Sequence, residues 1–372
     1  MRLRLAAAAL AVVAATVLLA ALRVSEHEPH AAAREPGGGP RAAQDSGPPD
    51  ARTAAQLAGQ RIVFGFNGTE APRALLRRIR RGEAAGVILF ARNIRSRAQV
   101  RRLTASLQRW RPPGDPPLIV SIDQEGGIVK RLAGAPRRSA AAIGRGGSEA
   151  LARAEGRNTA RNLRGVGVNV NFAPVVDIGR PGRIMRAQGR AFSSSPARVT
   201  RLAAAFAAGL REGGVIPCAK HFPGLGGARH DQDRRNNAIT LSAERLRSED
   251  YAPYEHMAKQ GLELVMTSTA DYPALDPGRP AVFSSRILVD ELRERVGFAG
   301  VTVTDSLGTR SATRLGSPEA RAVRAARAGN DLLLFASDYG AGVRGAGALA
   351  RRQLAPEATA RADALRRALT AP

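Results

Sequence analysis

From residue 57 onward, the chain alternates between short runs of apolar residues and longer amphipathic stretches that are rich in arginine and alanine. The apolar runs have the length of β-strands and show little polar alternation. Such runs are typical of strands that are buried on both faces of a sheet. We therefore expect strands at Ile62–Phe66, Gly86–Phe90, Leu118–Asp123, Val168–Phe172, Val215–His221, Leu262–Thr267, Val301–Asp305 and Asp331–Phe335.

The amphipathic stretches between these strands predict helices. We expect them at Pro72–Arg81, Ser96–Trp110, Ser148–Val166, Pro196–Gly213, Ala243–Gln260 and Ser284–Val296. Alternating strands and helices indicate a parallel sheet of the α/β class, and this number of units predicts a closed (β/α)8 barrel of the TIM type. A doubly wound open sheet is the alternative, but no glycine-rich dinucleotide-binding motif follows the first strand.

Polar residues end three of the predicted strands. Asp123 ends the third strand, Lys220 and His221 end the fifth, and Asp305 ends the seventh. In a parallel barrel the C-terminal strand ends meet at one mouth, where active sites form. A single aspartate after a strand is often only a helix cap. Three strand ends with charges of both signs predict a functional site.

Lysine is rare in this chain, which makes its position informative. Of 57 basic residues only Lys130, Lys220 and Lys259 are lysines. A compact ammonium and a planar guanidinium are not interchangeable in a tight pocket. The residues after Lys220 form a glycine-rich loop that ends in several polar side chains. We therefore expect residues 219–233 to carry chemistry.

Composition limits the classes of function. The net charge is +25, but aromatic residues make up only 4% of the chain and the arginines are spread along its length, so we expect no nucleic-acid partner. The single cysteine, Cys218, excludes an internal disulfide and lies in an apolar run, which predicts a buried core thiol. No His-Glu-x-x-His or clustered carboxylate pattern occurs, so no metal is expected.

The N-terminus has the sequence of a targeting segment. Arg2 and Arg4 precede an apolar run, Leu5–Leu22, which ends at Arg23. This run fits either a cleaved signal peptide or an N-terminal membrane anchor at residues 1–23, and both imply an extracytoplasmic protein. Residues 24–56, rich in Pro, Gly, Ala and charge, predict a disordered linker. Residues 57–372 are then one catalytic domain, which we expect to act as a monomer.

Six ordered motifs resemble those of glycoside hydrolase family 3, specifically its bacterial β-N-acetylhexosaminidase branch. The most specific is Lys220-His221-Phe222-Pro223-Gly224. The others are Gly86–Ile94, Ile122–Gly127, Gly167–Asp177, Gly189–Phe192 and Gly300–Leu307. The similarity covers roughly residues 57–355, and no second sandwich domain like that of larger β-glucosidase relatives follows.

This resemblance implies roles for individual residues. Asp305 corresponds to the nucleophile of a retaining mechanism, which forms a covalent glycosyl-enzyme intermediate. The positions that hold sugar hydroxyls are Asp123, Arg190, Lys220 and His221. For Asp123 and Arg190, a structural ion pair at the barrel mouth is the alternative. Asp177 fits a structural role at least as well as a ligand contact. The resemblance implies no cofactor.

The loop after the signature departs from the family. The branch typically has Lys-His-Phe-Pro-Gly-His-Gly-Asp, followed by an Asp-Ser-His that supplies the acid/base. Here Leu225 and Gly227 replace the first histidine and the following aspartate, and the final triplet is Asp231-Gln232-Asp233. Two further departures are Ile128, where arginine is usual, and Thr269, where histidine is common.

Three interpretations of this loop remain open. In the first, Asp233 or His230, beside Asp231, takes over proton transfer. In the second, the protein binds sugar without efficient hydrolysis. In the third, its substrate has a good leaving group and needs little help from an acid. We predict an exported retaining hydrolase that removes terminal β-linked N-acetylglucosamine or a related sugar from cell-wall or chitin-type glycans. The alternatives are a membrane-tethered, weakly active glycan-binding protein and a β-glucosidase-type enzyme.

Overall fold

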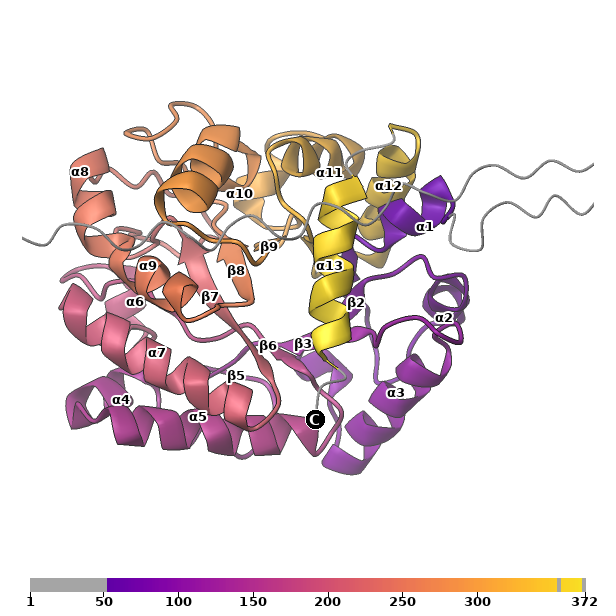
Figure 1. Ribbon diagram of the computed structural model, residues 1–372, viewed down its shortest axis with the longest axis horizontal. Coiled ribbons are helices and arrows are strands. Elements are labelled where there is room, and N and C mark those ends of the chain that lie inside the picture. The colour runs from indigo at the N-terminus through magenta and orange to yellow at the C-terminus, as the bar shows by residue number, and fades with distance from the viewer. Residues whose placement is uncertain (1–51, 353–355, 370–372) are drawn as a thin grey trace, which may run out of the picture. The chain divides into compact units, whose positions relative to one another are not determined.

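Eight parallel strands form the central sheet of the computed structural model, which describes residues 52–352 and 356–369 (Figure 1). The strands are hydrogen-bonded in the order β10-β1-β2-β3-β6-β7-β8-β9. The ring closes between β9 and β10, because the Thr304 amide donates to the Leu332 carbonyl at 3.0 Å and the Leu332 amide donates to Thr302 at 2.8 Å. The strands are β1 (Ile62–Phe64), β2 (Gly86–Leu89), β3 (Ile119–Ile122), β6 (Val170–Asn171), β7 (Ile216–Phe222), β8 (Leu264–Thr267), β9 (Val301–Thr304) and β10 (Leu333–Phe335).

Each of these strands lies within, or extends by one residue beyond, a strand expected from the sequence, so the predicted barrel is confirmed. The open doubly wound alternative is wrong, because an open sheet would leave β9 and β10 as unbonded edges. A short antiparallel hairpin, which the sequence analysis did not assign, follows β3. It consists of β4 (Gln124–Gly126) and β5 (Val129–Lys130).

The six predicted helices are also present, with two differences in type. The stretch at 243–260 is divided into α8, a π-helical turn (η2) and α9, and the stretch at 284–296 is a π-helical segment (η4). The long helices are α2 (Arg73–Arg80), α3 (Arg97–Arg109), α5 (Glu149–Arg164), α7 (Pro196–Glu212), α9 (Ala252–Lys259), η4 (Arg286–Arg295), α11 (Pro318–Arg327), α12 (Tyr339–Ala350) and α13 (Pro356–Ala368). The short ones are α1 (Ala54–Gly59), η1 (Ala91–Asn93), α4 (Ala140–Gly146), α6 (Ile184–Ala187), α8 (Ala243–Arg245), η2 (Leu246–Asp250), η3 (Ala281–Phe283) and α10 (Arg310–Thr313).

The apolar core has two layers. One lies between the sheet and its helices, and the other fills the barrel interior. Cys218 on β7 belongs to the interior layer and is fully buried, which confirms the predicted core thiol. Burial also raises the pKa of this thiol well above its usual value, so it stays protonated.

The last helix, α13, closes the N-terminal end of the barrel (Figure 1). Its residues Ala362 and Leu365 join the interior layer. Arg366 on the same helix is buried and donates to the carbonyls of Pro116 and Pro117, just before β3. Because this end is sealed by packed side chains, access to the barrel is from the opposite mouth.

The predicted N-terminal targeting segment lies outside the described residues, as does most of the predicted linker. The described chain instead begins by entering helix α1, where Thr53 and Gln56 form a capping box. This helix starts at Ala54, ahead of the domain boundary expected at residue 57. Over residues 52–352 and 356–369, none of the helices has both the length and the apolar content to span a bilayer.

Candidate active site

A cavity of about 680 Å³ opens at the C-terminal end of the barrel strands. Its wall includes all but one of the site residues expected from the sequence, drawn from the ends of β3, β7 and β9 and from two loops. These residues are Asp123, Arg190, Lys220, His221, Asp231, Asp233 and Asp305. The exception, His230, is exposed and does not line the cavity. Tertiary structure thus collects side chains that are up to 182 positions apart, from Asp123 to Asp305.

Four charged side chains form a closed group on one side of this cavity, which we call the clamp: Asp123, Glu125, Arg190 and Lys220. The Lys220 ammonium lies 2.7 Å from Asp123 Oδ1 and 2.8 Å from Glu125 Oε1. Arg190 pairs with both oxygens of Glu125 at 2.8 Å. Glu125 and Lys220 are buried. Their charges are therefore matched where water is scarce, as buried ions require.

The electrostatics of the clamp follow from this pairing. Burial alone would raise the pKa of Glu125, but the charges of Arg190 and Lys220 hold it well below its usual range. Burial works against protonated Lys220, and Asp123 and Glu125 reverse this, so the pKa of Lys220 is raised. The same balance with Glu125 raises the pKa of Arg190. All of these groups keep their charges across the ordinary pH range.

Backbone conformation around the clamp explains the glycines of its motifs. Gly126 has φ of +97°, and an added Cβ there would lie 2.3 Å from the Arg138 carbonyl oxygen. Gly224, after β7, has φ of +133°, and its Cβ would lie 2.6 Å from Asp250. Only glycine fits both the conformation and the space. These two glycines let the chain turn tightly, Gly126 directly after Glu125 and Gly224 four residues after Lys220.

His221 is fixed by Asp177. One oxygen of Asp177 lies 2.8 Å from His221 Nδ1, and the other accepts the backbone amides of His221 at 3.3 Å and Leu225 at 2.7 Å. Since a carboxylate accepts hydrogen bonds, this geometry places a proton on Nδ1 and leaves Nε2 as the remaining polar atom of the ring. Asp177 is buried and does not line the cavity. Its contacts support the structural role.

Asp305 follows β9 directly. Its backbone amide donates to the Thr267 carbonyl at 2.8 Å, which ties it to the end of β8. Its Oδ1 accepts the amide of Ser306 at 2.6 Å, and its Oδ2 accepts a hydrogen bond from the Gln232 side chain. The carboxylate is thus held on a rigid strand end with a donor on each oxygen.

The loop at residues 225–237, which we call the acid loop, crosses the cavity and carries Asp231 and Asp233. Asn237 anchors its middle by accepting the backbone amides of Arg229 and His230 at 3.1 and 3.0 Å. The Asp233 amide donates to Asp231 Oδ1 at 3.0 Å, which forms a local turn. Asp233 is thereby directed to the cavity while His230 is left in solvent. Of the two acid/base candidates, Asp233 lines the cavity and His230 does not.

The pKa of Asp233 is raised to about 6. The largest cause is desolvation by the surrounding protein, followed by the negative charges of Asp305 and Asp231. Asp233 is exposed at the cavity mouth, so water screens part of these interactions. A carboxyl that is protonated near pH 6 is suited to donate a proton.

Two of the positions that depart from the family pattern, Leu225 and Gly227, lie among apolar side chains. Leu225 is buried, and a Cβ on Gly227 would lie 3.0 Å from Ile239 and 3.5 Å from Leu241. Apolar groups therefore occupy the place of the usual polar residues. Ile128, by contrast, lies on the cavity rim with 64% of its surface exposed. It leaves the rim apolar where a cation is usual.

Sequence reasoning missed Glu125 and Gln232. Glu125 sits two residues after Asp123 in the sequence Asp123-Gln124-Glu125, and this spacing would have indicated that both carboxylates share a face of an extended segment. No comparable signal marks Gln232. Its neighbours in space are Asp305, Ser268 and Thr269, all distant along the chain.

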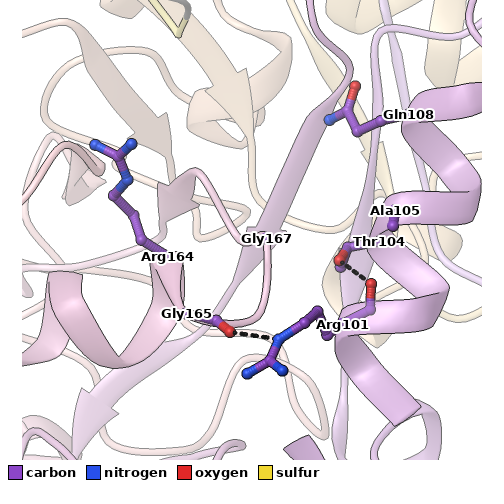
Figure 2. Close-up of a pocket in the computed structure, with 7 residues that line it drawn as sticks. All are labelled: Arg101, Thr104, Ala105, Gln108, Arg164, Gly165 and Gly167. Atoms are coloured by element: carbon purple, nitrogen blue, oxygen red, sulfur yellow. Dashed lines mark hydrogen bonds between the residues drawn. The ribbon is translucent and has the colours of Figure 1, made fainter. Parts of the chain in front are cut away.

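A second hollow, of about 290 Å³, lies on the other side of the fold, between α3 and the turn that leads from α5 to β6 (Figure 2). Figure 2 shows Arg101 donating to the Gly165 carbonyl, at 3.2 Å. The wall contains Thr104, Gln108 and Arg164 but none of the predicted site residues. Across the described ranges, no three His, Cys, Asp or Glu side chains are grouped to hold a metal ion. The cavity at the strand ends is therefore the candidate site.

Comparison with known proteins gives a consistent result. Residues 57–366 match the family described as "Glycosyl hydrolase family 3 N terminal domain". A β-hexosaminidase of Pseudomonas aeruginosa is 36% identical over 281 residues, covering 75% of this chain and 82% of its own. A secreted glycosyl hydrolase of Arthroderma benhamiae, itself uncharacterized, is 36% identical over 283 residues, covering 74% of this chain and 80% of its own.

Among solved structures, a family 3 β-N-acetylglucosaminidase from Paenibacillus superposes with a TM-score of 0.81 and 33% identity. The match covers 87% of this chain and 64% of that one, so the present chain spans under two thirds of the Paenibacillus enzyme. A β-N-acetylhexosaminidase from Beutenbergia cavernae matches with a TM-score of 0.74 and 31% identity, over 86% of this chain and 98% of its own.

Proposed function

This chain belongs to glycosyl hydrolase family 3, and we propose that it is an exported, retaining enzyme that releases terminal β-linked N-acetylglucosamine or a related sugar. The amino-sugar preference is supported by the β-hexosaminidase and β-N-acetylglucosaminidase relatives. Export is supported by the apolar N-terminal sequence and by the secreted relative from Arthroderma. Cell-wall or chitin-type glycans are the proposed source of the sugar.

In the proposed first step, a carboxylate oxygen of Asp305 bonds to the anomeric carbon while the bond from that carbon to the leaving oxygen breaks. The carboxyl of Asp233 transfers its proton to the leaving oxygen, so the aglycone departs as an alcohol. The oxygen of a water molecule then bonds to the anomeric carbon while the bond from that carbon to Asp305 breaks, and the Asp233 carboxylate takes the proton from this water. Both carboxyl groups return to their starting states.

The clamp would select the sugar. Lys220 and Arg190 donate to hydroxyl oxygens, whereas Asp123 accepts from hydroxyl groups, so the set fits one arrangement of hydroxyls. His221, oriented by Asp177, would add one more contact through Nε2. Because their partners hold these charged side chains in place before a sugar binds, little ordering would be needed on binding.

One observation carries the proposal: a single cavity is lined by three clamp residues (Asp123, Arg190 and Lys220), by Asp305 and by a carboxyl of raised pKa. A protein that only binds sugar needs nothing more than the clamp. A retaining hydrolase also needs one carboxylate on a rigid support and a second carboxyl whose pKa is raised so that it can donate a proton. Asp305 and Asp233 meet these two requirements.

The test is release of nitrophenol from nitrophenyl β-N-acetylglucosaminide by the purified protein and by Asp305→Ala. We expect slow turnover that the substitution abolishes. A matched control is Asp290→Ala, an exposed aspartate on η4 outside the cavity, which should leave turnover unchanged. Absence of turnover at high enzyme concentration would contradict the proposal. Faster release from the nitrophenyl β-glucoside would instead favour a β-glucosidase-type activity.

A second candidate function is glycan binding without efficient turnover. It is favoured by the triplet Asp231-Gln232-Asp233, which lacks the imidazole usual in the family. This candidate predicts calorimetric binding of N-acetylglucosamine that is lost in Asp123→Ala, together with no hydrolysis of a natural disaccharide. Robust release of the sugar from that disaccharide would exclude it.

A further inference from the structure

Gln232 occupies a position in the cavity that none of the family motifs explains. It is 6% exposed and lies between the acid loop, of which it is part, and the ends of β8 and β9. Its side-chain amide nitrogen donates to Asp305 Oδ2, and its Oε1 accepts from the hydroxyls of Ser268, at 3.3 Å, and Thr269, at 3.4 Å. One side chain therefore joins three separate segments.

The hydrogen bonds fix which end of the amide faces Asp305. Ser268 Oγ accepts the amide of Ala270 at 3.0 Å, and Thr269 Oγ1 accepts the hydroxyl of Thr309 at 3.5 Å. Each hydroxyl therefore has its own proton left to donate, and Gln232 Oε1 receives both. A flipped amide would place its carbonyl oxygen against the Asp305 carboxylate and lose these bonds. The donor end of Gln232 thus faces Asp305.

From this geometry we infer that Gln232 is the positioning residue for Asp305, and that it also anchors the acid loop to Asp305. The inference rests on the proposed function, in which Asp305 is the nucleophile. Because Gln232 directly precedes Asp233, the bond that orients the nucleophile also sets the position of the proton donor. The Gln232 carbonyl adds a second tie, since it accepts the hydroxyl of Ser311 at 3.1 Å.

This arrangement gives the two carboxylate oxygens separate, fixed partners. Oδ1 is held by the Ser306 amide of its own loop, and Oδ2 by Gln232 from across the cavity. Rotation of the carboxylate would break both bonds at once. A nucleophile that is held in one orientation starts closer to the geometry of attack, so loss of this donor should slow the glycosylation step without weakening sugar binding at the clamp.

The first test is Gln232→Met, which keeps the length and approximate volume of the side chain but removes its donor. We expect kcat for nitrophenyl β-N-acetylglucosaminide to fall about 10- to 100-fold, the effect of losing a hydrogen bond to a charged group. Inhibition by free N-acetylglucosamine, which reports the clamp, should be unchanged. Wild-type kcat in Gln232→Met, or a change confined to KM, would overturn the inference.

The matched control is Gln108→Met, in the hollow of Figure 2. Gln108 also bonds through both ends of its amide, to the amide and carbonyl of Leu118, but has no contact with the cavity. We expect this variant to lose stability and to keep kcat. If both variants lowered kcat by the same factor, the effect of Gln232 would be explained by its contribution to the fold, and not by its contact with Asp305.

Gln232→Glu supplies a readout that a merely structural role would not change. The introduced carboxyl has the same shape but can donate to Asp305 only when protonated, so activity should be restricted to acid pH and fall steeply as pH rises. The titratable and charged groups that line the cavity with this position are Arg92, Asp123, Arg131, Arg190, Lys220, His221, Asp231, Asp233, Arg234 and Asp305. All are shared with the wild type, so a difference between the two pH profiles belongs to position 232. Identical profiles would overturn the inference.

These outcomes separate the inference from the function on which it rests. If the wild-type protein fails to turn over the nitrophenyl substrate, or if Asp305→Ala remains active, the proposed function fails first. If the wild type is active and Asp305→Ala is not, the Gln232 variants test the positioning role alone. Thermal unfolding of each variant identifies any loss that comes from misfolding.

Discussion

The clamp and the acid loop lie on the same cavity but are stabilised in opposite ways. In the clamp, two cations and two carboxylates alternate within 2.7–2.8 Å of one another, and its central residues are buried. In the acid loop, Asp231 and Asp233 lie near Asp305, so charges of the same sign are collected. The loop is held by neutral groups, Gln232 and Asn237.

This difference teaches how one barrel mouth can separate binding from chemistry. Opposite charges at close range keep Glu125, Lys220 and Arg190 ionised and hold the clamp in one arrangement, which suits recognition of hydroxyls. Desolvation, followed by the like charges of Asp305 and Asp231, raises the pKa of Asp233, which suits acid catalysis. Substitutions in the clamp should therefore change stability and affinity, whereas substitutions in the acid loop should change rate and pH dependence.

The largest effect is expected from Asp233→Asn. Hydrolysis of a natural disaccharide should fall about 10²–10⁴-fold, because the leaving oxygen loses its proton donor. For the nitrophenyl substrate, kcat/KM should change little, since its leaving group departs without a proton. Azide can attack the glycosyl-Asp305 intermediate in place of water without needing a base. It should therefore restore turnover of the nitrophenyl substrate by Asp233→Asn. An equal loss of rate on both substrates would mean that another residue is the acid. The control is His230→Asn, at the exposed neighbour.

Glu125→Gln should cost about 3–5 kcal/mol in the free energy of unfolding, because it removes the carboxylate partner of Arg190 and leaves buried Lys220 with Asp123 alone. Denaturant titration measures this loss. The control is Glu212→Gln, since Glu212 also pairs with two arginines, Arg153 and Arg157, but at the surface, where water screens the charges. Equal losses in both variants would show that the clamp has no special stability.

Lys220→Arg tests whether the clamp needs an ammonium. One Nζ atom lies within 2.8 Å of both Asp123 and Glu125, a geometry that a planar guanidinium does not reproduce in a buried site. We expect kcat/KM to fall about 10- to 100-fold, mainly through weaker sugar binding. The surface variant Lys259→Arg should behave as wild type. If Lys220→Arg also kept wild-type kcat/KM, the clamp would need only a positive charge at position 220, and not an ammonium.

The pH dependence of the natural reaction should follow Asp233, whose pKa is raised to about 6. The acid acts in its protonated form, so the rate should fall as pH rises through about 6, by roughly tenfold per pH unit beyond it. Glu125, Lys220 and Arg190 do not titrate in this range and should add no further pH dependence. If the rate of Asp233→Asn still falls in the same way as pH rises, another group causes that fall.

The smallest effect is on stability, and its sign follows from the same shift. The folded pKa of Asp233 lies above the unfolded value, so the folded state holds the proton more tightly and stability falls as pH rises between about 4 and 6. Asp233→Asn removes this penalty. Because the group is partly solvated, we expect a gain below about 1 kcal/mol at pH 7 and none at pH 4, measured by thermal unfolding.

Much of the fold could be predicted from the sequence because its signals are local. Each apolar run became a strand of the barrel, and strand-end residues such as Asp123 and Asp305 had to meet at one mouth once the sheet was parallel. The helix α13, which seals the opposite end, was not anticipated. Its anchors, Leu365 and Arg366, depend on packing against distant strands and on carbonyls that have no sequence signal.

The acid loop marks the limit of prediction at the site. From the sequence, Asp233 and His230 were equal candidates for proton transfer, because both are chemically capable and close along the chain. Only the turn made by Asp231 and the anchoring by Asn237 distinguish them, by directing Asp233 to the cavity and His230 to solvent. Gln232 gave no signal at all, since an isolated glutamine in a polar loop is usually solvated.

The sequence by itself determined the barrel, the family and the set of charged strand ends, because apolar periodicity and ordered motifs are written along the chain. The tertiary structure decided which charges pair, which carboxyl has a raised pKa, and that Gln232 donates to Asp305. These properties depend on distances between side chains from separate strands and on how much water reaches them. Neither quantity exists until the chain has folded.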